Sequence, residues 1–208
     1  MALAPPWKVS FNKKRNIICK CLYLTGHITA LKRGVVIDMS RMDKILETNA
    51  EDMDCLVEAG VTRVQLNDSL RREGLFFSVD PGANASIGGM AATRASGTTT
   101  VKYGAMKSNV MGVTAVMADG SIIRTGGRFR KSASGYDLTS LLVGSEGTLG
   151  IITEVRLRLH PVPETVIAGV CCFKTLENAV LTAQAIIQNS VDVVCTVEPM
   201  TLIFSYNP

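Results

Sequence analysis

The stretch from Pro81 to Gly104 contains the residue types best suited to binding another molecule. It holds five glycines, and most of its other residues are alanine, serine or threonine. Small side chains bury little apolar surface and glycine costs conformational entropy, so the stretch is poor core material. Bare backbone instead approaches another molecule closely and offers it N–H groups. Two interpretations stay open: a site for a phosphate-bearing cofactor, or a loop or helix packed through small residues.

A second glycine cluster, Gly144, Gly147 and Gly150, comes directly before an apolar strand-like run. In a Rossmann fingerprint the glycine loop follows a strand and opens a helix, so this order differs. The sequence contains neither G-x-G-x-x-G nor Gly-Lys-Ser/Thr, which disfavours Rossmann and nucleoside-triphosphate sites. Glu146 has two interpretations, a contact to a polar cofactor group or a residue that stabilises the turn.

The bulk composition indicates a globular protein. Of 208 residues, 47% are hydrophobic and 19% are charged, which is ordinary for a folded domain. A net charge of +4 without a basic-aromatic stripe does not favour a nucleic-acid partner. No uncharged apolar run approaches the roughly 18 residues of a membrane helix, so no transmembrane segment is expected.

The amino-terminal segment is basic. Residues 1–37 contain seven Lys or Arg and no acidic residue. This pattern is consistent with a weak mitochondrial transit peptide or with an unstructured terminus, and it does not fit a secretory signal.

The six cysteines do not predict a metal site. They form no C-x-x-C pair and only two histidines are present, so no zinc or other metal site is expected. A reduced compartment is the simplest interpretation. Cys171 and Cys172 lie in an apolar run, which predicts a buried strand.

Turn and capping residues predict the first elements. Short apolar runs broken by polar turns predict a strand meander between Val35 and Gly60. Thr62 and Gln65 have capping-box spacing, so a helix should begin there and end near Gly74.

A hairpin should follow the first glycine stretch. Asp119 and Gly120 form its turn between two apolar arms, Val110–Met117 and Ser121–Ile123. A basic surface loop over 126–136 and a short helix over 137–143 come next.

The last third of the sequence predicts a strand and then the start of a further domain. Alternating side chains predict a strand over 150–159, with Ile152 and Glu154 on the same side. An apolar strand after Thr165 precedes a helix that Thr175 can cap, as at the start of a further domain.

Together the two glycine clusters resemble one family. The segments concerned are Pro-Gly-Ala-x-Ala-Ser-Ile-Gly-Gly-Met-x-Ala-Thr-x-Ala-Ser-Gly-Thr, then Ser-Ala-Ser-Gly-Tyr-Asp-Leu-Thr, then Gly-Ser-Glu-Gly-Thr-Leu-Gly-Ile-Ile-Thr. They are similar to the FAD-linked oxidases and dehydrogenases with a vanillyl-alcohol-oxidase (PCMH) type flavin domain. The resemblance runs from about Gly34 to about Asn189.

The resemblance implies an α+β fold with FAD as cofactor. It implies a mixed or antiparallel sheet flanked by helices, incomplete at the amino end, followed by the start of a second α/β substrate domain. The implied divisions are a divergent or disordered segment 1–33, a flavin (sub)domain 34–162, and the truncated start of a carboxy-terminal domain 163–208.

The implied cofactor contacts fall into three groups. The pyrophosphate and ribityl region would contact Pro81, Gly82, Ser86, Gly88 and Gly89. The segment toward the flavin would supply Thr93, Ser96, Gly97, Tyr103 and Gly104. The adenosine end would lie on Glu146, Gly150 and Ile152, largely through backbone.

The implied reaction is oxidation of a D-2-hydroxy acid in mitochondria. Such enzymes move a hydride from carbon 2 of an acid such as D-lactate to the flavin. The electrons pass on to an acceptor such as cytochrome c. Alternatives within the family act on D-2-hydroxyglutarate or glycolate, and a further alternative is a non-catalytic flavin-binding module.

Three departures from the family pattern stand out. The Gly-Gly-Gly-Thr loop of the family is not evident upstream of Gly34, and Arg94 stands where a small residue is usual. Arg94 would either pair with a phosphate or clash. The metal-binding histidines are also not matched, since His27 fits a turn and His160 a structural role. Catalytic residues therefore stay unassigned, and the chain alone is expected to be inactive.

Overall fold

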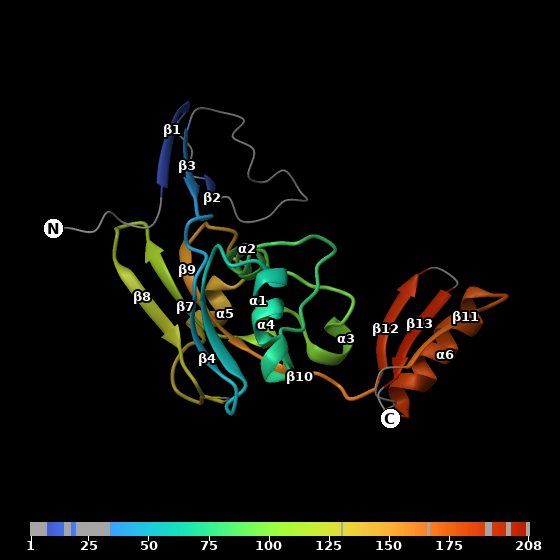
Figure 1. Cartoon of the computed structure of the whole chain (residues 1–208). Helices are drawn as coiled ribbons and strands as arrows, with labels where there is room; N and C mark the ends of the chain where they lie inside the picture. The colour runs from blue at the N-terminus through green and yellow to red at the C-terminus, as the bar shows by residue number, and fades with distance from the viewer. Residues whose placement is uncertain are drawn as a thin grey trace.

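A computed structural model describes residues 8–14, 18–19, 34–129, 131–165, 167–189, 193–198 and 201–206. Its largest element is a five-stranded antiparallel sheet in the order β4-β5-β9-β7-β8 (Figure 1). The strands are β4 (Ile45–Asn49), β5 (Asp54–Glu58), β7 (Val110–Met117), β8 (Ile122–Gly126) and β9 (Gly150–Arg158).

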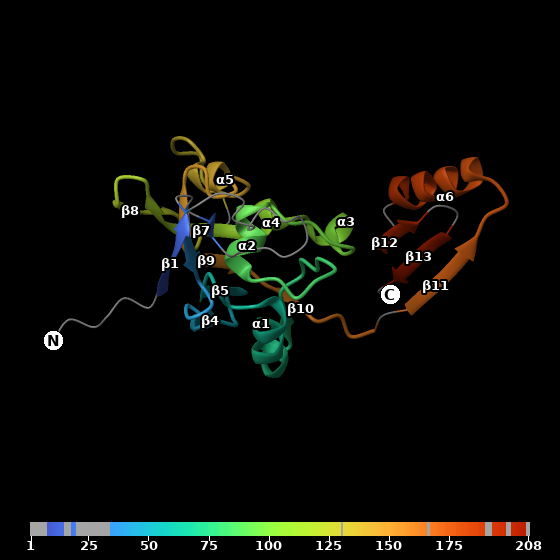
Figure 2. The same cartoon turned by 90° about the horizontal axis from the view of Figure 1, so that it is seen from above.

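Helices gather on one face of this sheet (Figure 2). They are α1 (Arg63–Leu70), which runs into a 3₁₀ turn (Arg71–Glu73), α2 (Ile87–Ala92), α3 (Thr100–Tyr103), α4 (Met106–Asn109) and α5 (Leu138–Leu142). The inward-facing side chains of β5, β7 and β9 pack under them in one core with Phe77, Ile87 and Met90. The two-stranded pair β6 (Leu75–Phe76) and β10 (His160–Pro161) closes the end of this layer.

Two smaller sheets flank the large one along the chain. Near the amino end, β1 (Lys8–Lys14), β2 (Ile18–Cys19) and β3 (Gly34–Asp38) pair in the order β1-β3-β2. Near the other end, β11 (Ile167–Cys172), β12 (Val193–Glu198) and β13 (Thr201–Tyr206) pair in the order β11-β13-β12, with α6 (Leu176–Gln188) beside them (Figure 1).

Most predicted elements are confirmed. The three strands predicted between Val35 and Gly60 are β3, β4 and β5, but only β4 and β5 pair with each other, because β3 lies in the sheet with β1 and β2. Helix α1 begins where its N-cap Thr62 accepts a hydrogen bond from the Gln65 amide at 3.2 Å. Gly74 ends the 3₁₀ turn in the left-handed conformation (φ 66°), as a C-cap glycine should. The α+β class with a largely antiparallel sheet is likewise confirmed. The domain divisions at 33/34 and 162/163 stay predictions.

The predicted side of Ile152 is wrong. Thr114 pairs with Glu154, but the next residue, Ala115, pairs with Ile152, so Thr153 is the extra residue of a bulge. A bulge shifts the alternation of a strand by one residue. Ile152 therefore points into the core together with Val155, away from Glu154.

The predicted burial of Cys171 and Cys172 is also wrong. Both residues end β11 and both are exposed. The apolar run does form a strand, but α6 buries only Ala179 of its own residues. A single helix on a three-stranded sheet does not enclose the end of β11.

Candidate functional site

The two glycine-rich segments meet at the end of α2. The Gly144 amide donates to the Ala91 carbonyl at 3.0 Å, and the Glu146 amide donates to the Ala92 carbonyl at 2.9 Å. The last carbonyls of α2 have no partner within the helix, so these contacts also satisfy them. Two segments some fifty residues apart thus lie side by side at the end of α2.

Arg94 is the residue at which the chain reverses direction after α2. The Arg94 amide donates to Ala91 (3.2 Å) and the Ala95 amide donates to Met90 (2.9 Å), which is the Schellman pattern. Arg94 has φ 52°, a left-handed conformation that glycine adopts most easily. Its exposed side chain passes Gly144, where an added Cβ would lie 3.1 Å from the Arg94 Cβ. The Arg94 side chain thus stays outside the core, and the energetic cost of an arginine at this position lies in its left-handed backbone.

Two glycines of the first segment differ in whether the packing of the fold requires glycine at that position. At Gly88 an added Cβ would lie 2.5 Å from the Ala59 Cβ, so packing of α2 on the chain after β5 requires glycine. The Gly88 amide is already donated to the Ala59 carbonyl at 2.8 Å. Gly82 is exposed, has no positive φ, and would place a Cβ in open space. The fold therefore does not require glycine at 82, whereas close approach by another molecule would.

Asp80 ties the start of the first segment to its interior at Thr98 and Thr99. Its carboxylate accepts hydrogen bonds from the Thr99 amide (3.0 Å) and hydroxyl (2.9 Å), and also from the Thr98 hydroxyl. At Gly97 an added Cβ would lie 2.3 Å from the same carboxylate, so only glycine fits there. This clamp fixes the turn at Gly97 beside the residue that precedes Pro81.

A buried asparagine holds the other end of the segment. Asn109 is 1% exposed, and its Nδ2 lies 2.9 Å, 3.1 Å and 3.0 Å from the carbonyls of Tyr103, Gly104 and Ala105. Its Oδ1 lies 2.9 Å from the His160 Nε2. Because the amide nitrogen faces three carbonyls, the oxygen must face His160, and His160 must donate from Nε2.

His160 is held in its neutral form by its surroundings. Its ring packs against Tyr103, with ring centres 4.7 Å apart, and against Phe76 at 6.2 Å. Burial lowers the pKa of His160, and the charge of Arg158 lowers it further. The predicted structural role of His160 agrees with these contacts. His27 lies outside the described residues.

The thirteen residues predicted to contact the cofactor differ in accessibility. Gly82, Ser96 and Glu146 are exposed, and a further group is half-buried: Pro81, Ser86, Thr93, Gly97, Tyr103 and Gly104. The others are buried: Gly88, Gly89, Gly150 and Ile152. The buried members can reach a ligand only through backbone. The Thr93 and Ser96 hydroxyls already donate within the segment, to Gly89 (2.9 Å) and Thr100 (3.1 Å).

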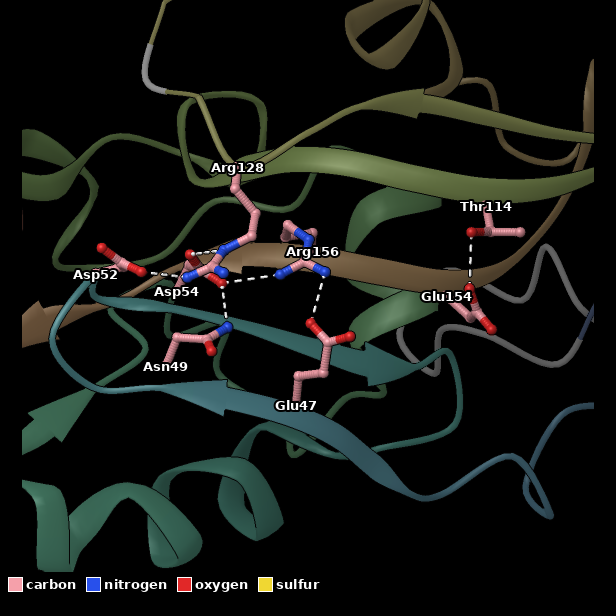
Figure 3. Close-up of polar contacts among 8 residues, drawn as sticks. All are labelled: Glu47, Asn49, Asp52, Asp54, Thr114, Arg128, Glu154 and Arg156. Atoms are coloured by element: carbon pink, nitrogen blue, oxygen red, sulfur yellow. Dashed lines mark hydrogen bonds and ion pairs between the residues drawn. The ribbon is translucent and has the colours of Figure 1, made fainter.

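The opposite face of the sheet carries an ion network that sequence reasoning missed (Figure 3). Asp54 is 1% exposed and accepts from Arg156 Nη1 at 2.9 Å and Arg128 Nε at 3.0 Å. Arg156 also pairs with Glu47 at 2.8 Å, and Arg128 pairs with Asp52. Burial opposes the charge on Asp54, but hydrogen bonds from Asn49 and the two arginines lower its pKa overall.

Two features are absent from the residues that the structure describes. Among them no group of three or more His, Cys, Asp or Glu is arranged to hold a metal ion. In the same part of the chain, no helix has both the length and the apolar character needed to cross a membrane.

The fold and the paired glycine segments define a flavin-binding protein. A family model described as "FAD binding domain" matches residues 20–126, so the chain belongs to this family. FAD is the cofactor that the family name states. The bare, exposed backbone at Gly82 beside the joined glycine segments fits a ligand that must approach the main chain closely.

Two curated relatives show which kind of family member the chain resembles. The chain is 48% identical over 170 residues to "D-lactate dehydrogenase [cytochrome], mitochondrial" of Arabidopsis thaliana, covering 82% of this chain and 30% of that protein. It is 50% identical over 173 residues to "Probable D-lactate dehydrogenase, mitochondrial" of Danio rerio, covering 82% and 35%. The chain thus spans about a third of the length of these curated relatives.

A solved structure agrees in fold. An alkyldihydroxyacetonephosphate synthase superposes with a TM-score of 0.74 at 29% identity, covering 86% of this chain and 33% of that one.

Proposed function

We propose that this chain forms part of a FAD-dependent dehydrogenase that oxidises a D-2-hydroxy acid, with D-lactate as the first candidate. The observation that carries the proposal is the pair of hydrogen bonds from Gly144 and Glu146 to the end of α2. They bring the two glycine segments side by side, and we take their exposed backbone, at Gly82 above all, as the surface that would contact the cofactor. The names of the two dehydrogenase relatives support the substrate class.

Each part of the surface has a proposed task. The loop from Pro81 to Ser86 would hold the pyrophosphate, with Gly82 allowing close approach. The turn that Asp80 clamps at Gly97, and the carbonyls that Asn109 fixes at Tyr103, would keep the segment beside the flavin rigid. When bound, FAD supplies the hydride acceptor for oxidation of the hydroxy acid to the keto acid.

The rigidity of this surface is its main contribution to catalysis. Hydride transfer needs donor and acceptor atoms at close range and in fixed orientation. Backbone hydrogen bonds at Ala91 and Ala92, and the buried Asn109, remove alternative positions of the segment before a ligand binds. Electron transfer to an acceptor such as cytochrome c, and a mitochondrial location, are part of the same proposal and rest on the relatives' names.

Flavin binding is tested by titrating the purified chain with FAD and following flavin fluorescence. Gly82→Val should weaken binding about tenfold or more, since the added branches occupy the space of close approach. The control Ala118→Val adds similar bulk at an exposed hairpin turn and should bind FAD normally. Equal affinity of both variants would remove Gly82 from the site.

The substrate is tested separately, with the FAD-loaded chain under anaerobic conditions. Bleaching of the visible flavin absorbance by D-lactate and not by L-lactate supports the proposal. Faster bleaching by D-2-hydroxyglutarate or glycolate would replace D-lactate by that acid. Bound flavin that none of these acids bleaches would leave only the flavin-binding role for this chain by itself, which is the result expected if the remaining catalytic groups lie in another part of the enzyme.

A further inference from the structure

Three of the hollows in the described part of the chain contain charged side chains, and two of these three are lined by equal numbers of acidic and basic residues. A hollow of about 390 Å³ on the open face of the sheet is lined by Glu47, Glu154, Arg124 and Arg156. Its Glu47–Arg156 pair is formed at 2.8 Å. A second, of about 150 Å³, is lined by two acidic and two basic residues, with its Asp52–Arg128 pair formed. Neither needs an added charge.

The third hollow is lined by more basic than acidic residues. It measures about 480 Å³ and lies where β7 and α4 meet, against the loop from β8 to α5. Four basic side chains line it, and one carboxylate does: Lys107, Arg124, Lys131 and Arg158, against Asp137. Arg124 and Arg158 also reach the two neighbouring hollows. The formal excess is three positive charges, four minus one.

The one carboxylate is already engaged. Asp137 is the N-cap of α5 and accepts from the Ser140 amide at 2.8 Å and the Ser140 hydroxyl at 2.5 Å. These bonds lower the pKa of Asp137, with a smaller contribution from the charge of Lys107. The Asp137 carboxylate thus interacts mainly with the first turn of α5 and compensates little of the positive charge in the hollow.

One of these basic side chains has a buried hydrogen-bond donor without a partner. The Arg158 Nε is buried and has no hydrogen-bond partner among the described residues. A buried donor without a partner costs free energy, and a charged donor costs more. Hydroxyl groups also line the same space, from Ser108 and from the mutually hydrogen-bonded Ser132 and Ser134, whose oxygens lie 3.1 Å apart. Such a set of donors suits the oxygens of an anion.

We propose that this hollow binds a multiply charged oxyanion, a small molecule that carries phosphate or several carboxylates. The excess of positive charge matches more than one negative charge, and the volume suits a ligand larger than a single inorganic ion. None of the thirteen residues predicted to contact FAD lines the hollow. The proposal therefore uses residues other than those of the proposed cofactor site.

Calorimetric titration of the full chain tests the proposal, with pyrophosphate and citrate as probes at constant ionic strength. At least one probe should bind with one-to-one stoichiometry, and the better probe identifies the phosphate or carboxylate chemistry. Lys107→Gln/Lys131→Gln should weaken binding about tenfold or more, because two charged donors are lost. Lys107→Arg/Lys131→Arg keeps the charges and should retain binding even if the glutamine variant folds poorly.

The matched control removes two exposed charges elsewhere. Arg72→Gln/Lys174→Gln lowers the net charge equally but lies outside the hollow. Equal weakening by this control would overturn the proposal, since it would mean attraction to the overall charge alone. Absence of binding by both probes would also overturn it. A third overturning result is displacement of the probe by FAD, which would place the probe in the cofactor site.

Discussion

His160 and Asn109 form a hydrogen bond of 2.9 Å between the ring Nε2 and the amide Oδ1, joining β10 to the end of α4. The same asparagine fixes the carbonyls of Tyr103, Gly104 and Ala105. The bond therefore connects the strand that follows β9 with the turn at which the first glycine segment ends. It supports the candidate site without being exposed to a ligand, since Asn109 is buried.

Asn109→Ala should destabilise the chain by about 2–3 kcal/mol, because it leaves several buried polar groups without their partner. The measurement is urea unfolding followed by circular dichroism. Asn178→Ala removes the same amide from an exposed position on α6 and should change the unfolding free energy by less than about 0.5 kcal/mol. Similar effects of the two substitutions would mean that the carbonyls find another donor.

The lowered pKa of His160 predicts loss of stability in mild acid. In the unfolded chain the histidine takes up a proton near its ordinary pKa of 6.5, whereas the folded state resists protonation. Stability is therefore complete above that pKa and falls as the pH drops below it. The unfolding free energy should be smaller at about pH 5 than at about pH 7.

His160→Gln tests the source of that pH dependence. Glutamine keeps an N–H donor for Asn109 but does not titrate, so the slope between these pH values should flatten. Asp54 and Asp137 do not interfere, because their pKa values lie below 3.8. An unchanged slope in the variant would assign the effect to another group.

Arg94→Gly should stabilise the chain by about 1 kcal/mol, because a left-handed residue other than glycine is strained. Thermal and urea unfolding measure the gain. Arg94→Ala is the matched control, since it removes the charge and keeps the strained backbone. A gain with alanine as large as with glycine would place the cost in the side chain instead.

Local patterns in the sequence predict the elements well, and long-range contacts are what they miss. Thr62 and Gln65 mark a helix start because the cap bond spans three residues. Asn109 and His160 are 51 residues apart, and Asp54 and Arg156 are 102 apart, so no spacing rule indicates either pair. For the same reason the bulge at Thr153 escapes prediction, since it depends on pairing with β7.

The candidate site shows the same limit. The glycine content of the segments indicates close approach, but not by what. Gly88 turns out to be required by its contact with Ala59 inside the fold, whereas Gly82 has no such contact. The three-dimensional structure is needed to distinguish a glycine that packing requires from one that could be replaced without a steric clash.

Thiol labelling should divide the described cysteines into two classes. Burial and the nearby charge of Asp54 raise the pKa of Cys55 to about 12, so it stays protonated and unreactive. Cys171 and Cys172 are exposed and should react with iodoacetamide while the chain is folded. Peptide mass mapping reads each position, with urea-unfolded chain as the control. Labelling of Cys55 as fast as Cys171 would contradict the burial of β5.

The ion network on the open face of the sheet should depend on its buried member. Asp54→Asn should cost about 3 kcal/mol, because Arg156, whose side chain is only 15% exposed, then loses the carboxylate that compensates its charge, while Arg128 at 46% exposure remains solvated (Figure 3). Asp52→Asn breaks only the outer bond to Arg128 and should cost less than about 1 kcal/mol, since that pair is exposed to solvent. Urea unfolding of both variants measures the difference. The lowered pKa of Asp54 adds a second readout: its contribution is present above its ordinary pKa of 3.8 and is lost as the pH falls through the lower folded value. Equal cost of the two substitutions would mean that Asp54 is solvated like Asp52, and that the network does not hold β5 to β9.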